Sequence, residues 1–493
     1  MLSDYTRLIS GSDLRGVSLG PGVTLDREAA RRAAAAFVRL LQGEGLGTAP
    51  RVAVGRDPRL SGPELMQGVF EGLCASGASC LDLGLCTTPA MFMATLRPDV
   101  DAAVMVTASH LPGNRNGLKF ITRQGGLEAA QIAALAADMD RAVEVPSELQ
   151  VQPLDFLPEY AAGLVDYIRR ATGRQRPLEG QRIVVDAGNG SGGFFAGLVL
   201  EPLGAQTAGS VNLEPDGRFP SHVPNPEEPE AMAYAAEAVL RAKADLGIVF
   251  DADCDRAALV DDRGGAINRN RLIALLAAAQ AARGPLGTVV TDSVTSLGLT
   301  RFIRSLGGEQ LRFRRGYKNV IDKAKELNAA GVDCPLAVET SGHCAFRDNH
   351  FLDDGAYMVC RVLASLNGAK PMELIAGLEE PAEEAELRFA LGEEDFRAQG
   401  RRAIDALRQA IGRRRDWSPS EDYEGVRALV ALPGGSQGYI LARLSVHDPV
   451  LPVNLEAYEP GGLRLLAAQL EQVLAGVGGL DLAPLNALAR QEG

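Results

Sequence analysis

The chain has 493 residues, of which 46% are hydrophobic, and this length allows several domains with separate cores. A formal net charge of −13 argues against nonspecific binding to nucleic acid, so an anionic substrate must meet local positive charge. Seven cysteines without C-x-x-C spacing argue against a zinc site or a disulfide framework and indicate a reducing compartment.

The N-terminal residues lack the profile of a secretory signal, and no uninterrupted apolar run approaches membrane-spanning length. We therefore expect a cytoplasmic protein that does not associate with membranes. An organelle stroma is the alternative if a transit peptide is missing from this sequence.

A short apolar run, a loop rich in Gly, Ser or Asp, and a helical pattern recur in this order along the chain. Such alternation predicts α/β layers with largely parallel strand pairing. The clearest examples are residues 51–57, 183–193, 246–256, 288–296 and 336–343.

Three segments are candidate domain boundaries. Residues 143–155 contain two prolines and little periodic pattern, which indicates a linker. A second boundary is expected near residues 261–265, and a third near Lys370-Pro371. Beyond the third, the charged segment 379–415 has periodic apolar positions that predict a helix in a differently built final domain.

The first polar cluster in chain order surrounds Ser109, directly after the apolar run 102–106. A serine after a strand is commonly a turn or helix-cap residue. Here Pro and Gly residues follow and favour a tight loop, and Lys119 returns ten residues later. Ser109 therefore offers a hydroxyl that could carry a phosphoryl group, while Lys119 can supply positive charge or a transferable proton.

A glycine pattern follows the apolar run 182–187. Gly188, Gly190 and Gly193 satisfy G-x-G-x-x-G, which makes a dinucleotide-binding oxidoreductase an alternative hypothesis. A tight strand-to-helix turn that needs small residues explains the same pattern. The oxidoreductase hypothesis also leaves Ser109 and the acidic cluster described next without a role.

An acidic cluster follows the apolar run 246–250, and Arg256 comes directly after it. Three carboxylates on alternate residues repel one another strongly, and a hard divalent cation that prefers oxygen ligands would neutralise them. An EF-hand is excluded because its sixth position would be Arg256 and its twelfth Asp262, where Gly and Glu are required. A solvated acidic turn is the other alternative. The cluster consists of Asp251, Asp253 and Asp255.

Two later clusters have side chains suited to sugars and phosphates. Carboxylate and hydroxyl groups can read the vicinal hydroxyls of a sugar, and histidine titrates near neutrality. An arginine fork beside a hydroxyl suits a phosphate dianion. The first cluster contains Glu339, Ser341 and His343, and the second contains Arg443, Ser445 and His447.

Taken in this order, the four clusters resemble those of the α-D-phosphohexomutase superfamily, the phosphoglucomutase and phosphomannomutase group. Ser109 matches the phosphoserine of its T-A-S-H-x-P…N-G-x-K pattern, and the three aspartates match the magnesium ligands of its D-G-D-G-D-R loop. The third cluster matches its G-E-x-S-G-H loop. Arg443, Ser445 and Asp448 match positions of its R-P-S-G-T-E-P loop, in which His447 replaces a family residue. Residues 11–16 and 55–62 resemble two further stretches of the family.

The departures from these patterns bear on substrate preference. Ala252 and Cys254 replace two glycines between the metal ligands, and Val338 replaces the glycine before Glu339. No residue decides between glucose and mannose phosphates, and a phosphoglucosamine mutase is an alternative because those enzymes share a similar S-G-H loop.

The resemblance implies a four-domain α/β architecture. Three similar mixed α/β sandwich domains and a distinct C-terminal α+β domain would surround a central cleft. The expected domains are residues 1–150 with the phosphoserine loop, 151–265 with the metal loop, 266–372 with the sugar-reading loop and 373–493 with the phosphate-binding loop.

The resemblance also implies an isomerase that interconverts hexose 1-phosphate and hexose 6-phosphate through a phosphoserine and a bisphosphorylated sugar. One Mg²⁺ would be held by Ser109 and the three aspartates, with hexose bisphosphate as activator. Lys119 or His343 would act as general base, while Arg15, Arg256 and His110 assist. A binding protein without turnover is disfavoured by the retained serine and carboxylates, and the enzyme is expected as a monomer or homodimer. The segment that faces the sugar would be Gly316, Tyr317 and Lys318.

Overall fold

We describe residues 5–392, 395–421, 423–445 and 449–489 of a computed structural model of the chain. They form two compact units. The first unit combines the chain up to residue 268 with residues 341–373, and the second combines residues 269–340 with those from 374 onward. Among the described residues, no helix combines the length and apolar character that crossing a membrane requires.

The first sheet of the first unit has the strand order β1-β2-β6-β5-β3-β4-β8, with β7 paired to β6. Strand β3 pairs in parallel with β4 and β5, whereas β6 runs antiparallel to β2 and β5. All residues of β5 are buried, which explains its uninterrupted apolar sequence. The strands are β1 (Ile9–Ser10), β2 (Asp13–Val17), β3 (Arg51–Arg56), β4 (Ser79–Leu85), β5 (Ala102–Val106), β6 (Arg115–Thr122), β7 (Gly125–Gly126) and β8 (Val151–Pro153).

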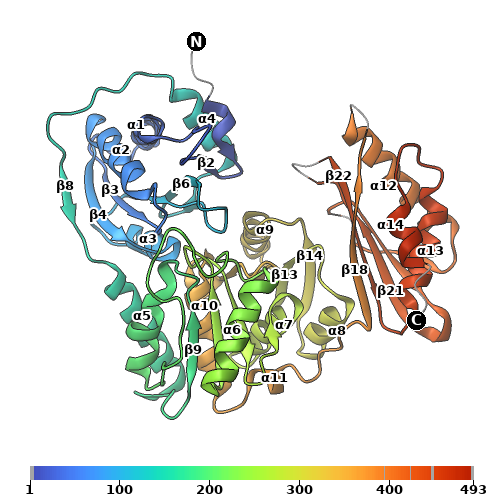
Figure 1. Ribbon diagram of the computed structural model, residues 1–493. Coiled ribbons are helices and arrows are strands. Elements are labelled where there is room, and N and C mark those ends of the chain that lie inside the picture. The colour runs from blue at the N-terminus through green and yellow to red at the C-terminus, as the bar shows by residue number, and fades with distance from the viewer. Residues whose placement is uncertain (1–4, 393–394, 422, 446–448, 490–493) are drawn as a thin grey trace. The chain divides into compact units, whose positions relative to one another are not determined.

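Helices α1, α2 and α4 share one hydrophobic core with this sheet, and all three lie on the same face of it (Figure 1). Helices α1 and α2 approach closely, because a Cβ at Gly72 would lie 2.0 Å from the carbonyl oxygen of Arg31. The helices of this region are η1 (Tyr5–Leu8), α1 (Arg27–Gly43), α2 (Gly62–Ala75), α3 (Thr88–Thr95) and α4 (Ala129–Asp138).

The second sheet of the first unit has the order β12-β11-β10-β9. Strand β10 pairs in parallel with β9 and antiparallel with β11, so the segment between β10 and β11 is the loop of a hairpin. This topology differs from the helix–loop–helix of an EF-hand. The strands are β9 (Ile183–Asp186), β10 (Leu246–Phe250), β11 (Ala257–Asp261) and β12 (Ala266–Ile267), and the helices are α5 (Leu157–Thr172), η2 (Ser191–Gly193), the π-helix η3 (Phe195–Leu200), η4 (Glu201–Leu203) and α6 (Pro229–Ala242).

The residues 341–373 add a short hairpin and a helix to the first unit. Helix α10 begins at Asp354, whose side chain accepts a hydrogen bond from the Tyr357 N–H, as a typical N-cap does. The elements are β16 (Cys344–Phe346), η5 (Arg347–Asn349), β17 (Leu352–Asp353) and α10 (Gly355–Leu366), followed by α11 (Pro371–Leu374).

The second unit contains parallel strands with helices and a separate antiparallel sheet. Strand β13 pairs in parallel with both β14 and β15. The elements of the parallel part are α7 (Arg269–Ala281), β13 (Thr288–Asp292), α8 (Leu297–Ser305), β14 (Glu309–Phe313), α9 (Tyr317–Ala329) and β15 (Leu336–Val338).

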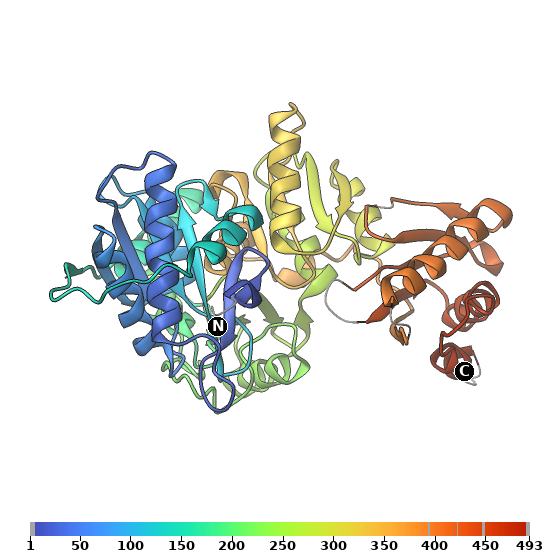
Figure 2. The ribbon, with the colours of Figure 1, turned by 90° about the horizontal axis from the view of Figure 1, so that it is seen from above.

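The antiparallel sheet has the order β18-β22-β21-β20-β19, and its helices share one hydrophobic core with it. Helices α12 and α13 lie on one face of this sheet (Figures 1 and 2). The elements are β18 (Glu383–Ala390), α12 (Phe396–Arg413), β19 (Trp417–Pro419), β20 (Val426–Ala431), η6 (Pro433–Gly435), β21 (Gln437–Ala442), β22 (Val450–Ala457), α13 (Gly462–Leu474) and α14 (Ala483–Ala489).

Three sequence predictions about the elements need correction. The segment 379–415 contains the predicted helix, α12, but its first part forms β18, along which exposure alternates with period two. The predicted linker 143–155 contains β8, which pairs in parallel with β4. Strand pairing is mixed rather than largely parallel, because β11 pairs antiparallel with β12 and β21 pairs antiparallel with both β20 and β22.

Candidate functional site

Ser109 lies directly after β5 and is buried in the first unit. Its backbone has φ 51°, a left-handed conformation that is uncommon for a residue with a side chain. The Ser109 Oγ donates a hydrogen bond to Asp251 Oδ2 over 3.0 Å and accepts one from Arg256 Nη2 over 3.4 Å. The hydroxyl is therefore held between a carboxylate and a guanidinium.

The loop between β10 and β11 brings Asp251, Asp253 and Asp255 together. One carboxylate oxygen of each lies within 4.8 Å of the other two, and all three side chains are buried. Asp253 Oδ1 has no hydrogen-bond partner among the described residues, although its other oxygen accepts from the Thr88 hydroxyl over 2.6 Å. Buried oxygen donors of this kind suit a hard divalent cation, so this cluster could hold a metal ion.

Two cations partly balance the three carboxylates. Lys119 Nζ lies 2.8 Å from Asp255 Oδ2 and 3.6 Å from Asp253 Oδ2. Arg256 Nε lies 3.2 Å from Asp251 Oδ2. If all five side chains are charged, the cluster keeps one net negative charge, which favours an additional cation.

The pKa values of two aspartates move in opposite directions. Burial raises the pKa of Asp251 well above its usual range, and the negative charges of Asp255 and Asp253 add to this effect. Burial alone would also raise the pKa of Asp255, but Lys119, His343 and Arg256 more than offset it and leave that pKa below its usual range. Asp255 is therefore held in its ionised form more firmly than Asp251.

Two predicted histidines border the cluster. His343 Nε2 lies 3.8 Å from Asp255 Oδ1 and 3.6 Å from Asp353 Oδ2, and its Nδ1 is 2.9 Å from the Ser341 Oγ. Burial keeps the pKa of His343 well below its usual range despite the neighbouring carboxylate of Asp255. A neutral imidazole at neutral pH can accept a proton.

His110 follows Ser109 directly, and its Nδ1 is 3.4 Å from the Ser109 Oγ. Burial lowers the pKa of His110 to about 3, with further contributions from the positive charges of Arg256 and Arg15. Arg15 lies on β2, and its guanidinium bonds Asp13 Oδ2 over 2.8 Å. The register of β2 and β6 sets Asp13 opposite Lys119 and Arg15 opposite Gly117, so one pair of strands carries both predicted cations.

The predicted sugar-facing residues are divided between the units: Ser341 and His343 belong to the first, and Glu339 to the second. In the second unit, Glu339 Oε1 accepts a hydrogen bond from the Gly316 N–H over 2.6 Å. Gly316 has φ 112°, which favours glycine, and it precedes α9, whose first two residues are Tyr317 and Lys318. Two segments that the sequence predicts to face a sugar thus contact each other.

Arg443 of the fourth predicted cluster is buried, and its Nε has no hydrogen-bond partner among the described residues. Burial lowers its pKa, and the positive charge of Arg315 acts in the same direction. Ser445 donates its backbone N–H to the Val450 carbonyl over 3.3 Å. His447 lies outside the described residues.

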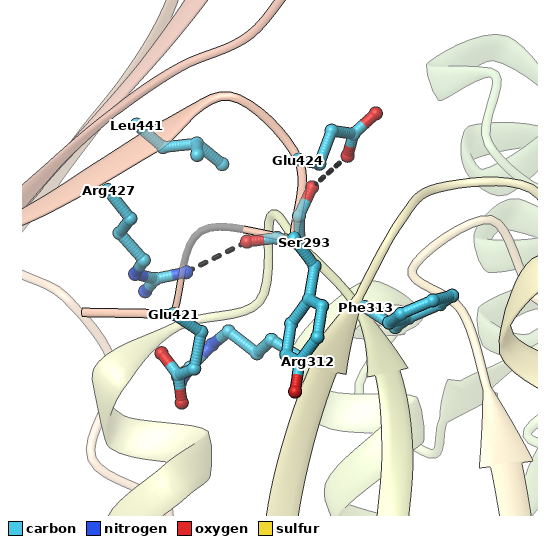
Figure 3. A pocket seen from close by; sticks show the side chains of 8 residues that line it. Ser293, Arg312, Phe313, Glu421, Glu424, Arg427 and Leu441 are labelled. Carbon is cyan, nitrogen blue, oxygen red and sulfur yellow. Dashed lines mark hydrogen bonds and ion pairs between the residues drawn. The ribbon is translucent and has the colours of Figure 1, made fainter. Parts of the chain in front are cut away.

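A small cavity in the second unit lies where the loop after β13 meets the antiparallel sheet (Figure 3). Ser293 donates to Glu424 Oε2 over 2.5 Å, and Arg427 Nη1 donates to the Ser293 carbonyl over 2.8 Å. The cavity holds about 10 Å³, which is room for about one water molecule. It is therefore a packing contact and too small for a sugar phosphate.

The three glycines of the G-x-G-x-x-G pattern, which follow β9, lie where other backbone segments pack too closely for a side chain. A Cβ at Gly190 would lie 2.7 Å from the Cα of Ala252, inside the acidic loop, and a Cβ at Gly193 would lie 2.0 Å from the Leu213 carbonyl oxygen. Gly188 has φ 53° and would meet Pro224. These contacts explain all three glycines without a dinucleotide.

Three further side chains that the sequence did not assign to the site contact its residues. Thr88, the first residue of α3, bonds Asp253, and Asp353 forms a second group of possible metal ligands with Asp255 and His343. Arg59 contacts the serine loop from within the stretch 55–62. Thr88 and Arg59 are far in the chain from the residues they contact, and Asp353 is far from Asp255, so the tertiary fold reveals these contacts.

Comparisons with known proteins show the family to which the chain is similar. Models of the phosphoglucomutase/phosphomannomutase α/β/α domains I, II and III match residues 7–144, 158–265 and 268–381. The phosphoglucomutase of Neisseria gonorrhoeae is 30% identical over 96% of this chain and 98% of its own length. The phosphomannomutase/phosphoglucomutase of Pseudomonas aeruginosa strain PAO1 is 34% identical over 72% of this chain and 73% of its own.

A solved structure is also similar over nearly the whole chain. The crystal structure of a phosphoglucomutase/phosphomannomutase family protein from Burkholderia thailandensis superposes with a TM-score of 0.80 at 30% identity. The alignment covers 98% of this chain and 99% of that one. The predicted mixed α/β architecture with a distinct C-terminal domain is thereby confirmed.

Proposed function

This chain belongs to the phosphoglucomutase/phosphomannomutase family of α-D-phosphohexomutases, and we propose that it interconverts the 1-phosphate and 6-phosphate of glucose, mannose or both through a phosphorylated Ser109. It is an isomerase of the phosphohexomutase class. The observation that carries the proposed chemistry is the Ser109 hydroxyl, buried 3.0 Å from a carboxylate of the acidic cluster and 3.4 Å from Arg256.

The first half-reaction moves a phosphoryl group from Ser109 to a free hydroxyl of the hexose monophosphate. The bond between phosphorus and the serine oxygen breaks, and a bond to the sugar oxygen forms. The proton of the sugar hydroxyl passes to a base, and the freed serine oxygen takes up one proton to become the Ser109 hydroxyl. The product is a bisphosphorylated sugar, which reorients and returns its other phosphate to Ser109. Phosphoryl transfer is accelerated mainly by positioning and by stabilisation of charge, which suits the fixed guanidinium of Arg256.

The acidic cluster is the proposed metal site. Asp251, Asp253 and Asp255, with an oxygen on Ser109, would hold one Mg²⁺, and the partnerless Asp253 Oδ1 supports this assignment. Bound there, Mg²⁺ would neutralise charge on the transferring phosphoryl group. Arg256 and Arg15 would add fixed positive charge beside it.

Lys119 and His343 are the two candidate bases. Lys119 is paired with Asp255, which favours its charged form. His343 is held neutral by burial and can take a proton without first losing one. Both residues stay candidates for the base, because the lowered pKa of His343 keeps it neutral but also makes it a weak base; His110 is a second neutral imidazole beside Ser109.

Sugar and distal phosphate would be bound by the remaining predicted residues. Glu339, Ser341 and the segment of Gly316, Tyr317 and Lys318 would read ring hydroxyls. Arg443, Ser445 and His447 would hold the phosphate that is not reacting, which is supported by the buried Arg443 Nε that has no hydrogen-bond partner in the described part of the chain. The predicted domain ranges, the cleft, the bisphosphate activator, the cytoplasmic location and the monomeric or homodimeric state stay predictions.

An assay panel tests the proposal. Purified enzyme with Mg²⁺ is given the 1-phosphates of glucose, mannose, glucosamine and N-acetylglucosamine, each with its bisphosphate, and products are followed by ³¹P NMR. We expect conversion of the glucose or mannose phosphate, and no conversion by Ser109→Ala. Ser365→Ala is the matched control, because that hydroxyl donates to the Val362 carbonyl of its own helix, away from the acidic cluster.

Conversion of glucosamine phosphate alone would make the alternative, a phosphoglucosamine mutase, correct. Failure with all four sugars would refute the proposed substrates.

A further inference from the structure

Arg59 is fully buried below the loop that carries Ser109. Its Nε bonds Asp57 Oδ2 over 3.0 Å, and its remaining N–H groups all point at backbone carbonyls. An arginine has five N–H donors, and each of them has an acceptor here. The four carbonyl contacts are Nη1 to Pro112 at 2.7 Å and Arg115 at 2.9 Å, and Nη2 to Ser109 at 2.5 Å and Leu111 at 2.6 Å.

All four carbonyls belong to residues 109–115, the loop that follows β5 and leads into β6. One rigid guanidinium therefore fixes both ends and the middle of this loop. A planar fork with donors in fixed directions can do this, whereas the ammonium of a lysine has three donors around one atom.

Asp57 extends the network to the backbone of Ser109. The Thr107 hydroxyl donates to Asp57 Oδ2 over 2.7 Å and accepts from the Ser109 N–H over 2.9 Å. Ser109 is thus held at its N–H through Thr107 and Asp57, and at its carbonyl by Arg59. These opposing contacts hold Ser109 in its left-handed conformation at φ 51°, which persists only where the surroundings enforce it.

A second segment closes over the guanidinium. The Phe219 ring centroid lies 5.3 Å from the Arg59 Cζ, in reach of a cation–π contact. A Cβ at Gly217 would lie 2.2 Å from the Pro58 carbonyl oxygen, so this segment packs directly on the 57–59 backbone. The Arg59 side chain is consequently fully buried, so its contacts to the serine loop are shielded from bulk solvent.

We propose that Arg59, with Asp57 and Thr107, is a positioning residue that fixes the serine loop so that the Ser109 Oγ faces Asp251 and Arg256 for phosphoryl transfer. This inference rests on the proposed function of Ser109. The network holds the backbone on both sides of the hydroxyl, and a misplacement of about 1 Å in a reacting group costs on the order of 10²-fold in rate. Arg59 touches no reacting atom, so its effect is on the geometry of the serine.

Arg59→Lys tests whether the planar guanidinium is required to hold the serine loop, and Arg123→Lys is the matched control. Arg123 also caps carbonyls of the same domain, with Nε 2.8 Å from the Thr95 oxygen and Nη2 2.7 Å from the Arg97 oxygen, at the other end of β6. We measure Ser109 phosphorylation by glucose 1,6-bisphosphate with Mg²⁺, kcat and KM, and the thermal midpoint of each variant.

For Arg59→Lys we expect the rate of Ser109 phosphorylation and kcat to fall on the order of 10²-fold, with KM nearly unchanged. Arg123→Lys should keep both rates close to wild type. A folded Arg59→Lys protein with wild-type phosphorylation, or equal losses in the two variants, would overturn the proposal.

Thr107 provides a second test that does not disturb the buried arginine. Thr107→Ser keeps the hydroxyl relay between Asp57 and the Ser109 N–H, whereas the nearly isosteric Thr107→Val removes it. We expect wild-type-like phosphorylation for the first variant and a loss of at least about 10-fold for the second, with faster hydrogen exchange of the amides in residues 109–115. Equal rates and equal exchange in the two variants would overturn the proposal even if Arg59→Lys does not fold.

The exchange measurement needs no substrate, so it separates this inference from the proposed function. A wild-type enzyme that converts no hexose phosphate would refute the proposed function, while faster loop exchange in Thr107→Val would still support the network.

Discussion

Replacing Lys119 by methionine removes one of the two cations that balance the buried acidic cluster. The side chain of Lys119 is 8% exposed, and it bonds Asp255 over 2.8 Å. Methionine fills a similar space without charge. The substitution therefore leaves Asp251, Asp253 and Asp255 with Arg256 alone as the neighbouring cation, and the net charge of the cluster becomes more negative by one.

The expected loss of stability is large, because removing one partner of a buried pair leaves the other charge uncompensated and costs about 3–5 kcal/mol. For a domain of this general size that loss corresponds to a drop of roughly 6–20 °C in the thermal midpoint. The more negative cluster should also attract a divalent cation more strongly. Mg²⁺ at 100 times its Kd adds about 2.7 kcal/mol of stability, so it should recover much of the loss.

The assay is thermal unfolding of both proteins in EDTA and in increasing Mg²⁺. Lys370→Met is the control, because the Lys370–Asp262 pair has a lysine side chain that is 57% exposed and should contribute at most about 1 kcal/mol. Equal thermal midpoints of Lys119→Met and wild type in EDTA would refute this prediction. It would also be refuted if Mg²⁺ raised the midpoint of Lys119→Met by no more than it raises that of wild type.

Three further predictions address the serine, the distal phosphate and the acidic loop. Ser109→Ala should abolish turnover with sugar bisphosphate supplied and keep the wild-type thermal midpoint; full activity would remove this serine from the mechanism. Arg443→Ala should mainly raise KM in steady-state kinetics, and an unchanged KM would contradict its role in phosphate binding. Gly190→Ala would set a Cβ 2.7 Å from the Ala252 Cα, so it should cost about 1–3 kcal/mol in chemical unfolding and weaken Mg²⁺ binding measured by calorimetry. Wild-type stability and affinity would show that this glycine is not required for packing against the acidic loop.

The sequence was sufficient to locate most of the site because its residues follow short buried strands. Ser109 follows β5 and the acidic cluster follows β10, so local sequence patterns predicted both positions. The fold brings the Ser109 Oγ within 3.0 Å of Asp251 Oδ2. The contacts of Thr88, Asp353 and Arg59 could not be inferred, since each depends on the approach of distant segments. The glycine pattern at Gly190 illustrates the same limit, because its close neighbour Ala252 is distant in the chain.

The final part of the chain shows where periodicity misleads. In the segment 379–415, charged residues dominate and apolar residues fit a helical spacing, yet residues 383–390 form β18. This strand pairs along its whole length with β22, which lies about seventy residues later in the chain. That non-local pairing outweighed the local pattern, whereas α12, which follows it, is helical as expected.

The most direct test of the account is intact-mass analysis of the enzyme after incubation with glucose 1,6-bisphosphate and Mg²⁺, with the modified residue located by peptide mapping. The account predicts the gain of one phosphoryl group, located on Ser109 and lost when a hexose monophosphate is added. An enzyme that is active on hexose phosphates but never carries phosphate on Ser109 would contradict it.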